Sequence, residues 1–271
     1  MHIKDKIVLI ILLALALFFA NSANHHNKLI SLASIESPTP SIKPLESISV
    51  PVLIYHYVEY VQDEKDTIRK SLNIIPYIFI KQIETLKNAG YTFVTMSELI
   101  DMFDGKKELP QKLIAITFDD GYRDFYTDVF PILKKYNVKV TAYIVSGFLD
   151  RLNYLFTPHL KEIVKSGLVE IGAHTVHHYS LRGLNFEVAK YEIEESKKEL
   201  ETILGNPIVS FAYPDGSFDE QAIQLVENAG FKSAVTTMHG FEINRKNKYS
   251  IFRLHPGGKT ENYLLNFIEQ K

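Results

Sequence analysis

From residue 50 onwards, strand-like and helix-like patterns of hydrophobic positions alternate along this chain. Apolar runs of about four to eight residues are typical of buried strands, and apolar residues spaced three and four apart mark one face of a helix. The predicted strands are 50–55, 113–118, 139–145, 168–171, 208–213, 231–237 and 250–254. The predicted helices are 77–88, 98–103 capped by Ser97, 124–136, 157–165, 185–204, one that opens with the capping box Ser217-x-x-Glu220, and 261–268.

This alternation predicts an α/β fold around a parallel sheet, which is either open or closed into a barrel. No internal repeat and no second linker interrupts the pattern, so we expect one domain over residues 50–271. The polar residues that could take part in catalysis follow directly after predicted strands. Barrels and doubly wound sheets build their active sites at the C-terminal ends of their strands.

The first 49 residues are typical of an export segment and a tether. Lys4 and Lys6 precede an apolar run over residues 7–20, which is shorter than the roughly 20 residues of a spanning helix. We expect 1–23 to be a signal peptide or N-terminal membrane anchor, and the Ser/Pro-containing segment 24–49 to be a flexible linker. Either arrangement predicts an extracellular or cell-envelope location, with the protein secreted or anchored by residues 7–20.

The composition excludes several classes of protein. The chain has no cysteine, which rules out disulfides, thiol catalysis and thiolate-bound zinc. Its net charge of −2 and the lack of a long basic run argue against a nucleic-acid partner. A hydrophobic content of 46% is enough for a sizeable core. We expect the protein to be a monomer.

Two adjacent carboxylates, Asp119 and Asp120, stand where the predicted strand 113–118 ends. Neighbouring strand residues point to opposite faces, so the pair has two separate duties. Segment 174–178, His-Thr-Val-His-His, adds three histidines after a later strand. One carboxylate and two imidazoles make a three-ligand site for Zn²⁺, with Co²⁺, Ni²⁺ or Mn²⁺ as substitutes, and leave room for water. Spacing alone does not choose between the last two histidines.

Four further histidines lie in the predicted domain. His255 ends the last predicted strand and is the candidate general acid for a leaving nitrogen, although a strand-end histidine in a turn is nearly as good an interpretation. His56 also follows a strand, and we expect a hydrogen-bonded core histidine there. We expect His159 at the surface and His239 in a loop.

These motifs resemble those of the polysaccharide deacetylases of the NodB-homology type, carbohydrate esterase family 4. Residues 117–122, Thr-Phe-Asp-Asp-Gly-Tyr, are similar to the first motif of that family, and residues 174–178 to the second, H-[S/T]-x-x-H. Segment 211–216, Phe-Ala-Tyr-Pro-Asp-Gly, resembles the third motif in its extracellular poly-N-acetylglucosamine deacetylase form. The similarity also includes 51–57, 90–94 and 229–231, and it spans nearly all of residues 50–255.

The resemblance implies a deformed (β/α) barrel with its active site at the C-terminal strand ends. It selects His178 over His177, so the implied metal ligands are Asp120, His174 and His178. It assigns Asp119 as the base that takes a proton from water.

The third motif implies a substrate-binding segment at Tyr213, Pro214 and Asp215, whose backbone N–H after the proline helps to hold the oxyanion. Many relatives carry arginine where this chain has Ala212, an aromatic residue at the position of Asp215, and a tryptophan in a later motif, which this chain lacks altogether. In those relatives these elements orient the acid histidine. The departures leave the role of His255 as general acid open.

We therefore expect a metal-dependent hydrolase that removes N-acetyl groups from an extracellular N-acetylglucosamine-containing polysaccharide. The alternatives are an acetyl-ester deacetylase of the xylan type, a peptidoglycan deacetylase, or a catalytically silent carbohydrate-binding protein with the same fold. The retained Asp119 argues against the last of these, since a binding protein needs no base.

Overall fold

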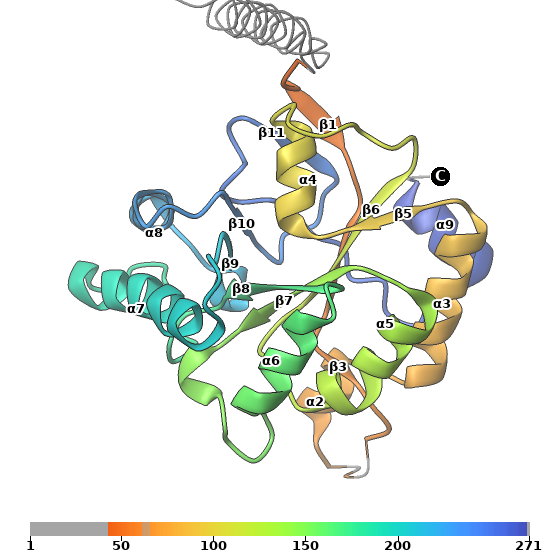
Figure 1. Ribbon diagram of the computed structural model, residues 1–271, viewed down its shortest axis with the longest axis horizontal. Helices are drawn as coiled ribbons and strands as arrows, with labels where there is room; N and C mark the ends of the chain where they lie inside the picture. The colour runs from red at the N-terminus through yellow and green to blue at the C-terminus, as the bar shows by residue number, and fades with distance from the viewer. Residues whose placement is uncertain (1–42, 62, 64, 270–271) are drawn as a thin grey trace, which may run out of the picture. The chain divides into compact units, whose positions relative to one another are not determined.

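A computed structural model describes residues 43–61, 63 and 65–269 of the chain (Figure 1). The predicted signal peptide or anchor, residues 1–23, and linker residues 24–42 lie outside the described residues. Within the part that is described, no helix combines the length and the apolar character needed to cross a bilayer.

A seven-stranded sheet forms the centre of the folded unit, and all of its strand pairs are parallel. Its strands run in the order β10-β9-β8-β7-β6-β2, and β5 also pairs with β6. These strands are β2 (Val52–Tyr55), β5 (Thr92–Val94), β6 (Leu113–Phe118), β7 (Val140–Ile144), β8 (Val169–Ala173), β9 (Ser210–Ala212) and β10 (Ser233–Val235).

Helices follow most strands and surround the sheet (Figure 1). They are α2 (Thr67–Leu72), α3 (Pro76–Asn88), α4 (Met96–Phe103), α5 (Phe130–Tyr136), α6 (Thr157–Lys165), α7 (Phe186–Leu204), α8 (Glu220–Asn228) and α9 (Glu261–Ile268). A π-helical turn, η1 (Phe125–Val129), leads into α5, and two short 3₁₀ turns, η2 (Ser146–Phe148) and η3 (Pro214–Gly216), follow β7 and β9. The predicted alternation of strands and helices is confirmed.

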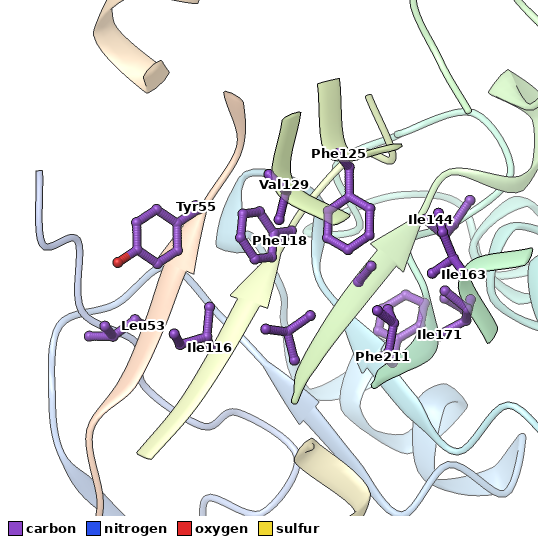
Figure 2. Packing of buried hydrophobic residues seen from close by; sticks show 14 of the residues in the cluster. Leu53, Tyr55, Ile116, Phe118, Phe125, Val129, Ile144, Ile163, Ile171 and Phe211 are labelled. Carbon is purple, nitrogen blue, oxygen red and sulfur yellow. The ribbon is translucent and has the colours of Figure 1, made fainter. Parts of the chain in front are cut away.

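The alternation of side chains along β6 separates two hydrophobic clusters. Ile114, Ile116 and Phe118 pack in the larger cluster together with α3, α5, α6 and α7. Leu113 and Ala115 face the other side of the sheet, where α4 covers a smaller cluster. Figure 2 shows the larger cluster, in which the ring of Phe118 stacks on that of Tyr55 from the neighbouring strand, with centroids 5.3 Å apart. We call the side of the sheet that carries the smaller cluster the inner face. Because side chains alternate along β6, the residues that follow Ala115 on the inner face are Thr117 and Asp119.

Two predicted helix starts lie at the wrong residue. Thr95, not Ser97, caps α4: its hydroxyl accepts from the N–H of Glu98, whose carboxylate accepts from the N–H of Thr95. Asp219, not Ser217, caps α8 through a bond from a backbone N–H in the first turn. The helix α4 thus begins two residues before the predicted start, so Ser97 lies within its first turn, whereas α8 begins at Glu220 directly after its aspartate cap.

Two further differences lie at the ends of the folded unit. Residues 250–254, predicted as a strand, form only isolated bridges through Ile251 and Leu254 to Val235 and Leu53. Conversely, β1 (Ser47–Ser49) lies in the predicted linker and pairs antiparallel with β11 (Glu242–Asn244). Another short pair joins β3 (Tyr57–Val58) to β4 (Asn73–Ile74). Such short pairs depend on partners distant in sequence, so local periodicity does not reveal them.

Candidate active site

Three side chains from two strand ends converge on one point. Asp120 follows β6, and His174 and His178 follow β8. The Oδ1 atom of Asp120 lies 3.3 Å from Nε2 of His174 and 3.2 Å from Nε2 of His178. Donor atoms that surround a tetrahedral Zn²⁺ at about 2.0–2.1 Å lie roughly 3.3–3.4 Å from one another. The spacing of these atoms therefore fits a small divalent ion.

The hydrogen bonding of the same atoms also fits a metal. Oδ1 of Asp120 is buried, yet it forms no hydrogen bond with any of the described residues. A buried, unpaired carboxylate oxygen is costly, and a bound cation would satisfy it. Nδ1 of His174 lies 2.7 Å from the carbonyl oxygen of Ala212, which only accepts, so this nitrogen carries the proton. The Nε2 lone pair of His174 is then directed at the site.

The backbone at these residues is unusual. Asp120, Thr175 and His178 have φ angles of 72°, 64° and 59°, in the left-handed region that non-glycine residues rarely adopt. Gly121, next to Asp120, has φ of 74°, and a Cβ there would lie 3.0 Å from a methyl group of Ile144. Strained backbone of this kind persists only where surrounding contacts enforce it, and it gathers at functional sites.

The second carboxylate, Asp119, forms a buried ion pair that the sequence analysis missed. Nη1 and Nη2 of Arg253 each lie 2.7 Å from one oxygen of Asp119. Arg253 is fully buried and also donates to the hydroxyl of Thr117 and the carbonyl of Thr236. Burial alone would raise the pKa of Asp119, but the guanidinium outweighs it and holds this pKa below its usual range. The signal in the sequence was a single charged residue inside the apolar run 250–254.

The arginine beside Asp119 therefore comes from the segment after β11, while position 212 is alanine. The small side chain of Ala212 packs in the smaller hydrophobic cluster, and the backbone carbonyl of Ala212 orients His174. The absence of arginine from position 212 accordingly leaves neither Asp119 nor His174 without a partner.

Two histidines lie close to this ion pair. His56 and His255 line a small cavity of about 80 Å³ together with Pro256 and part of β4. Burial lowers the pKa of His56, which the charges of Asp119 and Asp120 oppose. Burial also lowers the pKa of His255, and His56 adds to this effect. His56 is partly exposed at the site, which differs from the hydrogen-bonded core position that we expected.

The predicted substrate-binding segment separates into buried and exposed parts. Tyr213 is fully buried, and its hydroxyl donates to the carbonyl oxygen of Tyr249, so this side chain belongs to the core and does not line a groove. Pro214 is also buried, whereas Asp215 is exposed with φ of 57°. Burial disfavours the charged form of His178, but Asp120 and, further away, Asp215 hold its pKa above the usual value. Asp215 therefore lies within electrostatic range of the candidate ligands.

His177, the alternative ligand, is directed elsewhere. Its Nδ1 lies 2.7 Å from Oε1 of Glu192, and it is His178 that joins Asp120 and His174. Of the other histidines, His159 stacks on Tyr126 with centroids 3.9 Å apart and is not part of the cluster of candidate ligands.

A row of tyrosines, which the sequence analysis did not single out, borders the candidate ligands. The ring of Tyr122 stacks between those of Tyr57 and Tyr154, with centroid separations of 3.8 and 5.2 Å. Burial raises the pKa of each tyrosine, and the charge of Asp120 raises it further, which locates the row beside the site. For Tyr57 the resulting pKa is about 12.

Comparisons with known proteins identify polysaccharide deacetylases as similar to this chain. The family model for polysaccharide deacetylases matches residues 106–234. The Bacillus subtilis protein YxkH is 29% identical over 79% of this chain and 73% of its own length. The poly-beta-1,6-N-acetyl-D-glucosamine N-deacetylase of Staphylococcus aureus is 24% identical over 91% of this chain and 88% of its own.

A solved structure bears out the fold. The Streptococcus pyogenes deacetylase PplD, in complex with acetate, superimposes with a TM-score of 0.76 and 28% identity, covering 82% of this chain and 98% of PplD. The expected deformed (β/α) barrel of the NodB type is thereby confirmed, and it takes the form of a curled parallel half-barrel with flanking helices.

The buried ion pair leads to a stability prediction. Arg253→Met leaves Asp119 buried without its partner, which should lower the free energy of unfolding by about 3–5 kcal/mol. The folded-state pKa of Asp119 is lowered, so the pair stabilises the fold above the unfolded-state pKa, and this contribution is lost as the pH falls through the folded-state value. The cost of Arg253→Met should therefore shrink towards acidic pH.

Urea denaturation measures these free energies at each pH. Adding Asp119→Asn to Arg253→Met should recover part of the loss, because no buried charge then remains. Arg245→Met is the matched control, since Arg245 is half-exposed and pairs with Asp104 at the surface. A cost for Arg253→Met no larger than that of Arg245→Met would contradict the prediction.

Proposed function

Since the chain belongs to the polysaccharide deacetylase family and is itself a polysaccharide deacetylase, we propose that it removes N-acetyl groups from an extracellular N-acetylglucosamine polymer in a metal-dependent reaction. The observation that carries this proposal is the convergence of Asp120, His174 and His178 next to a second carboxylate, Asp119. A catalytically silent carbohydrate-binding protein would need neither three converging metal ligands nor a carboxylate that Arg253 fixes beside them.

In this proposal Asp120, His174 and His178 hold one divalent metal, with Zn²⁺ the best match to the two imidazoles and one carboxylate. The bound metal supplies polarisation of the acetyl carbonyl and a lowered pKa for the attacking water. Groups of the protein orient the ligands, transfer the protons and bind the oxyanion. The carbonyl of Ala212 keeps the Nε2 lone pair of His174 available for binding.

We assign the base to Asp119. Its lowered pKa keeps it ionised at neutral pH, and the two bonds from Arg253 fix the orientation of the carboxylate. Asp119 takes a proton from water as the oxygen attacks the acetyl carbon, and the backbone N–H of Asp215 helps to hold the developing oxyanion. When the carbon–nitrogen bond breaks, the amine takes up a proton and acetate leaves.

Two histidines compete for the role of the acid that protonates the amine. His255 is the residue that the sequence motif favours, and His56 lies in the same cavity and within range of both aspartates. The lowered pKa of each is consistent with a neutral imidazole at rest, which would accept a proton before donating it.

The substrate class is proposed from the relatives and from the N-terminal segment. The S. aureus relative is named for poly-β-1,6-N-acetyl-D-glucosamine, and PplD holds acetate, the product of deacetylation. Residues 7–20 fit an export signal or anchor, which would deliver the enzyme to polymers outside the cell. Peptidoglycan and acetylated xylan are the alternative substrates.

The proposal predicts which polymer releases acetate and what abolishes the release. We expect more acetate from poly-N-acetylglucosamine than from peptidoglycan or acetylated xylan, and little from any of them after treatment with a chelator. Added Zn²⁺ should restore the activity. Undiminished release in the presence of the chelator would contradict the metal dependence, and a preference for another polymer would replace the proposed substrate.

Substitutions of Asp119 and of Asp120 should impair the enzyme in different ways. Asp119→Asn should reduce the turnover number by about 10²–10⁴-fold while the protein keeps its metal, because the base is lost and the three ligands remain. The variant also removes the charge that pairs with Arg253, so its free energy of unfolding is measured in parallel. Asp120→Ala should lose the metal itself, which elemental analysis detects. Full activity of Asp119→Asn would rule out Asp119 as the base.

The acid is identified by comparing His255→Ala with His56→Ala. We expect the variant that lacks the acid to lower the turnover number by about 10²-fold or more and to remove the basic limb of its pH profile. His159→Ala is the control, because the ring of His159 stacks on Tyr126 and is not part of the cluster of candidate ligands. If neither variant changes the profile, both assignments are wrong and a water must deliver the proton.

A further inference from the structure

We propose that Glu192 is a positioning residue that holds loop 174–178 in the conformation required for metal binding. The inference rests on the metal site proposed above. Glu192 lies on α7, where its side chain is 1% exposed. Its three hydrogen bonds all end on this loop, whose first and last residues are the ligand histidines.

The carboxylate binds the middle of the loop. Oε2 of Glu192 accepts from the N–H groups of Val176 and His177, at 2.9 and 2.8 Å. Oε1 accepts from Nδ1 of His177 at 2.7 Å. Bonds to an ionised acceptor are stronger than those between neutral groups, and two consecutive N–H groups that share one oxygen fix the peptide plane between them. The peptide group between Val176 and His177 therefore cannot rotate freely, and this restricts the backbone that connects His174 to His178.

The loop needs such support because its backbone is strained. Thr175 and His178 both have positive φ, and threonine is a β-branched residue for which this conformation is a clear outlier. A residue held in this conformation carries a free-energy cost that surrounding contacts must offset. Within the loop, the hydroxyl of Thr175 accepts from the N–H of His178 at 2.9 Å. The other compensating bonds come from outside it.

Two elements hold opposite edges of the loop. From η2, the N–H groups of Ser146 and Gly147 donate to the carbonyls of Thr175 and Val176, each at 3.1 Å. The approach at Gly147 is so close that a Cβ there would lie 2.5 Å from the carbonyl oxygen of Val176. On the other edge, the N–H groups of the loop meet the carboxylate of Glu192.

The position of Glu192 on its helix supports a role beyond packing. Ala189, Ile193 and Leu200 form the buried stripe of α7, and Glu192 lies within that stripe. An apolar residue would cost less to bury there than a charge does. Residues that orient metal ligands are worth about 10–100-fold in metal affinity, and the carboxylate of Glu192 contacts the loop that carries two of the three ligands.

The test measures metal affinity and not only activity. Chelator-stripped wild type, Glu192→Ala and Glu192→Gln are titrated with Zn²⁺ in competition with a chromophoric chelator. Their Co²⁺ absorption spectra and their urea denaturation without metal are recorded in parallel. Glu194→Gln is the matched control, because Glu194 is an exposed carboxylate on the same helix.

We expect Glu192→Ala to bind Zn²⁺ about 10–100-fold more weakly than wild type and to show an altered Co²⁺ spectrum. Glu192→Gln should rescue most of the affinity, because its amide oxygen can accept from both N–H groups while its NH₂ group faces His177. Glu194→Gln should match wild type. If Glu192→Ala does not fold, Glu192→Asp, which is one methylene shorter, should show the same direction of change.

Wild-type Zn²⁺ affinity in folded Glu192→Ala or Glu192→Asp would overturn the inference, as would a loss of stability alone. Asp120→Ala separates this failure from failure of the proposed function. If Asp120→Ala leaves Zn²⁺ binding intact, the metal site itself is wrong. If it abolishes binding and the Glu192 variants do not, only the role of Glu192 is wrong.

Discussion

The buried ion pair between Asp119 and Arg253 is the contact on which the arrangement of the site depends. It joins the end of the central strand β6 to segment 250–254, which bridges β10 through Ile251 and β2 through Leu254. A buried carboxylate without a partner would be protonated or displaced. With the pair formed, Asp119 stays charged in a dry interior, directly beside the residue that follows it, Asp120.

The strand geometry explains how two neighbouring aspartates acquire different surroundings. Alternation along β6 sends Phe118 into the larger hydrophobic cluster and Asp119 to the inner face, where Arg253 lies. The left-handed backbone at Asp120 and Gly121 then ends the strand geometry, and the second carboxylate turns towards the histidines. One turn thus separates a carboxylate paired with a cation from one that faces two imidazoles.

The features that could be predicted from the sequence are those determined by residues close together along the chain. The apolar runs gave the central strands, and the short motifs contained Asp120, His174 and His178, which the structure brings together. Arg253 and Glu192 were missed because their partners lie 134 and 15 residues away, and a charged residue in an apolar pattern does not indicate what it meets. For the same reason Tyr213 was assigned to the substrate, whereas its hydroxyl has a partner in the core.

The carbonyl of Ala212 has a consequence for how such a site can diversify. A main-chain oxygen survives any substitution at its own position, so the orientation of His174 does not depend on the identity of residue 212. The cation beside the base is supplied separately, by Arg253 from another segment. The side chain at 212 is thus released from both tasks, and the limit on its size is set by the packing of the smaller hydrophobic cluster in which it is buried.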